Sequence, residues 1–245
     1  MAVVAAAFGF TVAGLITRKY MLVKHTSVMR FLSIFAWIMV ASLAADPIFF
    51  AITRNLTTQE MADSVIQIQT SFSFAGTALA NIVLICFLKS IFYEGRSKLW
   101  MRAIVVIELG VAILMPVLAF AVAEPLYVLV LHAFASIIIY IFQAIRAFAI
   151  GSKLKREKST DVASINGITL IGLSGVLLIS TFCAFIMQEI AFVFKEDFLA
   201  IGLIDNLGCS LFVAIGFVLA VVSLFVLYVG YYVPSWIKKR WQSGT

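Results

Sequence analysis

Four ionisable residues lie inside long apolar stretches of this sequence. They are Asp46, Glu108, His132 and Asp205. An acid or an imidazole at membrane depth is costly to bury, because the hydrocarbon holds no water to solvate it, and such groups commonly mark ligand, ion or proton sites. Each of the four is therefore a candidate site residue.

Counting along the expected helices at about 1.5 Å per residue sorts the buried polar residues into two layers. We predict that an outer layer forms a polar cavity for a small ligand, and it comprises Asp46, Gln67, Gln69, His132, Asp205 and Asn206. We predict an inner polar network of Asn81, Glu108 and Gln143. The alternative for the outer layer is interhelical hydrogen bonding without a ligand. The alternative for Glu108 is an interfacial pair with Lys98 or Arg102.

Within the outer layer, Asp46 and His132 share a depth of about 9 Å below the outer helix ends. A carboxyl group and an imidazole in contact could share a proton and change charge around physiological pH. The alternative is a neutral hydrogen bond, or no contact at all, since their two helices need not be neighbours.

The residue inventory argues against several enzyme classes. His25 and His132 are the two histidines of the chain, too few for a membrane zinc hydrolase or a bis-histidine haem. A Ser–His hydrolase would depend on His132 without a Gly-x-Ser-x-Gly context. A retinal protein needs a lysine in the last helix, but Cys209 stands four residues after Asp205, where that lysine would be. We expect no enzyme, no metal site and no cofactor.

The elements that would carry these residues are membrane-spanning helices. Hydrophobic residues make up 63% and charged residues 12% of the 245-residue chain, and the mean hydropathy is +1.10, which excludes an ordinary soluble domain. We predict an all-α membrane protein, a seven-transmembrane helix bundle forming one domain over residues 1–245. The expected spans are 1–17, 31–52, 65–88, 103–123, 126–149, 165–187 and 203–233.

The distribution of basic residues predicts the orientation of the bundle. Sixteen of the 18 Lys and Arg residues fall on one side of the expected spans, and Arg54 and Lys195 fall on the other. Cytoplasmic loops carry the excess of Lys and Arg. We therefore expect a multi-pass protein of the cell membrane with its N-terminus outside and its C-terminus inside.

The net charge of +6 does not indicate nucleic-acid binding, because the basic residues form short clusters between apolar runs. Such clusters favour anionic lipid headgroups or a cytoplasmic signalling partner. The residues expected to make these contacts are Lys153, Lys155, Arg156, Lys158, Lys238, Lys239 and Arg240. For the loop of residues 151–164, partner docking and lipid contact both stay open.

The last helix ends in a run of aromatic residues followed by a basic triplet. It reads Tyr231-Tyr232-Val233-Pro234-Ser235-Trp236-Ile237-Lys238-Lys239-Arg240. This run, together with the topology, is similar to the exits of prokaryotic seven-helix sensor modules, such as those preceding histidine kinases. The resemblance implies a signal-input domain.

These observations favour a receptor-like seven-helix protein that binds a small ligand in its outer half and signals to a cytoplasmic partner. A small-solute or proton-coupled transporter or channel, using Asp46, His132 and Glu108 as a relay, is the first alternative. A structural subunit of a larger membrane complex is the second.

Overall fold

The computed structural model is all-helical, as the sequence predicts. It describes residues 2–22, 26–53, 59–93, 98–120, 126–157, 161–193, 211–234, 237 and 241. The elements in these ranges are seven α-helices, without a strand among them. Each is long and apolar enough to cross a membrane. In hydrocarbon the backbone polar groups must be paired within the segment itself, so an isolated apolar run folds as a helix.

The helices extend beyond several of the predicted spans. Their bounds are α1 (Ala2–Leu22), α2 (Ser27–Thr53), α3 (Gln59–Phe92), α4 (Leu99–Phe120), α5 (Leu126–Arg156), α6 (Val162–Val193) and α8 (Leu211–Tyr231). The largest extensions are at the start of α3, at the end of α5 and at the end of α6. Leaving the apolar region does not end a helix, because polar residues continue the same hydrogen-bond ladder in water.

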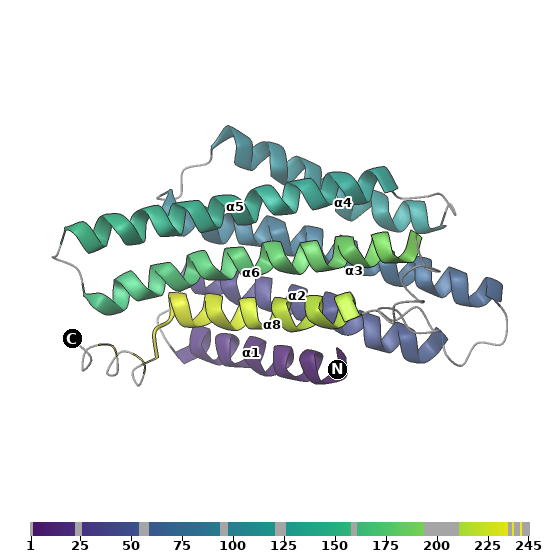
Figure 1. Cartoon of the computed structure of the whole chain (residues 1–245), viewed down its shortest axis with the longest axis horizontal. Coiled ribbons are helices and arrows are strands. Elements are labelled where there is room, and N and C mark those ends of the chain that lie inside the picture. The colour runs from purple at the N-terminus through teal and green to yellow at the C-terminus, as the bar shows by residue number, and fades with distance from the viewer. Residues whose placement is uncertain are drawn as a thin grey trace. The chain divides into compact units, whose positions relative to one another are not determined.

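The chain forms two compact units, residues 1–139 and residues 140–245, and α5 contributes to both. In the first unit α2 packs between α1 and α3, and α3 packs against α4 (Figure 1). In the span of α2, 61% of the residues are buried, against 22% in α1, as expected when α2 has a neighbour on two sides. The prediction of a single domain is not tested by this division.

Polar side chains join α1 to α2 within the first unit. The Thr17 and Ser33 hydroxyls lie 2.7 Å apart, and the Trp37 indole Nε1–H donates to Thr17 Oγ1 at 2.7 Å. Interhelical hydrogen bonds of this kind stabilise helix pairs in membranes by about 1 kcal/mol.

In the second unit α6 packs against α8 (Figure 1). Their backbones approach each other at two glycines. A Cβ atom built on Gly167 would lie 2.6 Å from the carbonyl oxygen of Gly230, and one on Gly230 would lie 2.7 Å from that of Gly167. Small residues allow this close approach, which membrane helices use in place of a hydrophobic driving force. The contact is reciprocal, so both positions need glycine.

Candidate functional site

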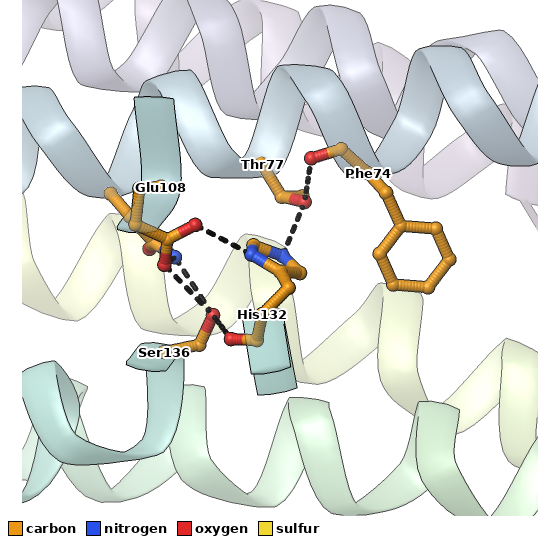
Figure 2. A network of polar contacts seen from close by, with 6 residues as sticks. Phe74, Thr77, Glu108, His132 and Ser136 are labelled. Carbon is orange, nitrogen blue, oxygen red and sulfur yellow. Dashed lines mark hydrogen bonds and ion pairs between the residues drawn. The ribbon is translucent and has the colours of Figure 1, made fainter. Parts of the chain in front are cut away.

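A glutamate and a histidine form a short, fully buried pair in the first unit. Glu108 on α4 and His132 on α5 place Oε2 and Nδ1 2.6 Å apart, and neither side chain has exposed surface. Figure 2 shows the imidazole ring of His132 lying between Glu108 on one side and Thr77 on the other. The pair holds the principal ionisable groups of the site.

Asn81 on α3 connects this pair to Ser136. Its side-chain Nδ2 donates to Glu108 Oε1 and to Ser136 Oγ, each at 2.8 Å. The Ser136 hydroxyl lies 2.8 Å from the carbonyl oxygen of His132, to which it donates, and 3.5 Å from Glu108 Oε1. One amide therefore joins α3, α4 and α5.

Thr77 contacts the second ring nitrogen of His132, Nε2. The Thr77 hydroxyl donates to the carbonyl oxygen of Phe74 at 3.0 Å, and the same Oγ1 lies 3.0 Å from His132 Nε2. A hydroxyl has one hydrogen to donate. When that hydrogen is directed to Phe74, Nε2 carries a hydrogen and donates to Thr77; when it is directed to Nε2, Nε2 accepts.

When Nε2 carries a hydrogen, the remaining proton lies between His132 Nδ1 and Glu108 Oε2. If it is on Nδ1, the pair is an imidazolium and a carboxylate; if it is on Oε2, both groups are neutral. The two arrangements have the same net charge of zero. A site excluded from water favours a pair whose net charge is zero, because an uncompensated buried charge raises the free energy of the folded protein.

Apolar packing surrounds the pair. Phe74 presents its ring edge to His132, with centroids 5.7 Å apart and planes at 86°. Ala78 on α3 forms a buried cluster with Val111 and Met115 on α4, and Val128 of α5 packs against it. Among the described residues no group of three His, Cys, Asp or Glu side chains could hold a metal ion.

The structure corrects the assignment of His132 and Glu108 to separate layers, since the two are bonded directly. It also corrects the pairing of Glu108 with Lys98 or Arg102, because the carboxyl group is buried and contacts Asn81 and His132. The depths were counted from the end of each helix, and adjacent helices of different length and tilt do not end in one plane.

The other members of the outer layer are placed only in part. Gln69 is half-buried on α3. Asp46 and Gln67 lie on α2 and α3, but their side chains fall outside the described residues, as do Asp205 and Asn206 altogether. The contact between Asp46 and His132 stays a prediction.

Asn81 and Glu108, two members of the predicted inner network, are hydrogen-bonded to each other. Gln143, the third predicted member, bonds within the second unit. Its Nε2 donates to the carbonyl oxygen of Ile171 at 2.9 Å and to Ser174 Oγ at 2.7 Å, which joins α5 to α6. The buried Oε1 of Gln143 has no hydrogen-bond partner in the described part of the chain.

Sequence reasoning missed Thr77 and Ser136. Hydroxyl residues are frequent in membrane helices and often bond within their own helix, so neither was conspicuous. The available signal was spacing: Thr77 precedes Asn81 by four residues, and Ser136 follows His132 by four. Residues four apart share a helix face.

Of the basic residues expected to contact lipid or a partner, three are described. Lys153 pairs with Glu157 at 3.8 Å, and Lys155 and Arg156 are exposed at the end of α5. Lys158, Lys238, Lys239 and Arg240 lie outside the described residues.

Fold and site together define a multi-span helical membrane protein with a buried acid–imidazole pair. Comparisons with protein families, with curated proteins and with solved structures found no match for the chain.

Proposed function

We propose that this is a receptor-like membrane protein whose switch is the proton shared by Glu108 and His132. The observation that supports it is the 2.6 Å contact between two ionisable side chains without exposed surface. Ionisable groups are rare and costly at membrane depth, so a buried pair of them is a candidate functional site.

A change in proton number would destabilise the closed arrangement. Gaining a proton leaves a protonated acid beside an imidazolium, and losing one leaves a carboxylate beside a neutral ring. Either change leaves a net charge in a site without exposed surface, which costs several kcal/mol unless water enters. The helices carrying the network, α3, α4 and α5, then favour a more open arrangement, and proton binding selects between two states.

The response would reach a partner along α5. This helix carries His132 and Ser136 and continues to Arg156, the basic end expected to lie inside the cell. A movement of α5 at the site would therefore alter the surface offered to a cytoplasmic protein. The signal in this proposal is a proton or a small cation that displaces it.

The test measures the distance between two spin-labelled helix ends as a function of pH. Spin labels at Leu22 on α1 and Leu99 on α4, which are 70% and 83% exposed, would report movement of α4 within the first unit. We expect the distance distribution to change with pH in the otherwise wild-type protein. Glu108→Gln and His132→Gln should each make it independent of pH, and the double variant should add little, as for coupled residues.

Ser223→Ala is the matched control, because the buried Ser223 hydroxyl donates within its own helix to the carbonyl oxygen of Ala220. It should leave the pH response unchanged. A distribution that does not change with pH in the wild-type background would refute the switch.

Proton-coupled transport is the second candidate. It is favoured by the continuous run of hydrogen bonds from Thr77 through His132 and Glu108 to Asn81 and Ser136. A receptor should carry no sustained proton current in vesicles beyond that of protein-free vesicles. A current that Glu108→Gln abolishes would replace the receptor by a transporter.

A further inference from the structure

A hollow of about 440 Å³ lies between the end of α5 and the beginning of α6, wholly within the second unit. Four residues line it from α5 and four from α6: Phe148, Gly151, Ser152 and Lys155, and Val162, Ile165, Asn166 and Thr169. The candidate membrane spans of these helices are Val130–Arg156 and Val162–Met187. The hollow therefore lies at one end of both candidate spans, where we expect the lipid headgroups.

The lining combines one cation, small hydrogen-bonding groups and an apolar part. Lys155, Ser152, Asn166 and Thr169 supply the polar part, and Phe148 contributes a ring that is 38% exposed. The ring of Phe148 lies over Gly172, whose built Cβ would stand 2.9 Å from it. Along α5 the lining thus runs from the Phe148 ring, farther into the span, to Lys155 at the helix end, and along α6 it runs from Val162 at the helix start to Thr169.

Lys155 is the charged group available to a ligand. Its neighbour Lys153 pairs with Glu157 at 3.8 Å, whereas no acceptor in the described part of the chain pairs with Lys155. The backbone N–H groups at the beginning of α6 do not form an anion site. Asp161 already accepts hydrogen bonds from those of Ala163, Ser164 and Ile165. Recognition would rest on side chains.

We propose that this hollow binds the phosphodiester headgroup of an anionic phospholipid. Lys155 would pair with the phosphate, Ser152 and Asn166 would donate hydrogen bonds to it, and the acyl chains would pass along Phe148. Basic pockets between membrane helices bind anionic headgroups in this way. The exposed aromatic ring at the hydrocarbon side favours a lipid over a free anion or a protein segment.

The test is native mass spectrometry of the whole chain in micelles that contain phosphatidylglycerol or phosphatidylcholine. We expect one retained phosphatidylglycerol and much weaker retention of phosphatidylcholine. Lys155→Gln should weaken phosphatidylglycerol binding about fivefold or more, the effect of one basic residue near a membrane surface. Ser152→Phe, which fills the hollow without changing the charge, should weaken it as much.

Lys153→Gln is the matched control, since it removes one positive charge two residues away on the same helix. It should weaken binding less than about twofold, because a paired exposed lysine contributes little. Equal losses for Lys153→Gln and Lys155→Gln would overturn the site and leave general attraction to a basic loop.

Two further results would also overturn the proposal. Displacement of the lipid by inorganic phosphate, but not by chloride at the same ionic strength, would indicate a free-anion site. Loss of a co-purifying protein in Lys155→Gln, with lipid retention unchanged, would indicate a partner surface.

Discussion

Asn81 bridges Glu108 and Ser136 with the two hydrogens of one amide group. Replacing it by leucine, which is similar in shape, would leave Glu108 Oε1 without its closest donor in a buried site. We expect Asn81→Leu to destabilise the protein by about 1–2 kcal/mol, the cost of an unsatisfied buried acceptor in a membrane helix. Unfolding by a denaturing detergent, followed by circular dichroism, measures this change.

Ser174→Ala provides the comparison for Asn81→Leu, because Ser174 is also buried and bonded between helices, but to the neutral Gln143. It should cost less than about 1 kcal/mol, since the partner lost is uncharged. If Asn81→Leu costs no more than Ser174→Ala, the amide does not support the ionisable pair.

The sequence identified several individual residues of the site, but it did not predict the contacts between them. Glu108, His132 and Asn81 were conspicuous because each is a polar residue in an apolar stretch. Their mutual bonding was not predictable, since depth along a helix does not say which face meets which neighbour. Thr77 and Ser136 complete the network through i to i+4 spacing, a pattern that ordinary membrane helices also contain.

The backbones of α6 and α8 come closest in the second unit at Gly167 and Gly230. In either alanine variant the new methyl group would stand within 2.7 Å of a backbone oxygen on the other helix, which cannot rotate away. We expect Gly167→Ala and Gly230→Ala each to destabilise the protein by about 1–3 kcal/mol, the cost of overpacking. Thermal unfolding in detergent provides the measurement.

Gly14 on α1 is the matched control, because no described atom lies within 4 Å of its built Cβ. Gly14→Ala should be neutral or stabilising by up to about 1 kcal/mol, since alanine favours the helix. Destabilisation equal to that of Gly167→Ala would show a general sensitivity of helix glycines instead of a backbone contact.

At the scale of elements, hydropathy predicted the seven helices, and their ends were predicted less well. The hydrocarbon determines which residues must be helical, but not where a helix stops in water. The end of α5 illustrates this: it continues from the predicted residue 149 to Arg156 through Lys153 and Lys155. The span prediction placed those extra turns in a loop. In the structure they contribute the polar residues that line the hollow from α5.

For the whole molecule, 16 Lys and Arg residues lie on one side of the expected spans and two on the other. This asymmetry predicts the orientation in the membrane. In right-side-out vesicles a tag before Met1 should be cut by external protease, and a tag after Thr245 should be protected. Vesicles opened with detergent control for the cleavability of both tags. Cleavage of both tags in closed vesicles, or of neither, would contradict an odd number of crossings.

The burial of Glu108 and His132 also has a kinetic consequence. Neither side chain has exposed surface, so water cannot deliver or remove a proton until α3, α4 and α5 part. Proton transfer between bonded groups is fast, whereas collective helix motions take microseconds to milliseconds. If the proposed proton switch operates, we expect helix separation to limit the rate of its response to a pH jump, so that the rate does not depend on buffer concentration.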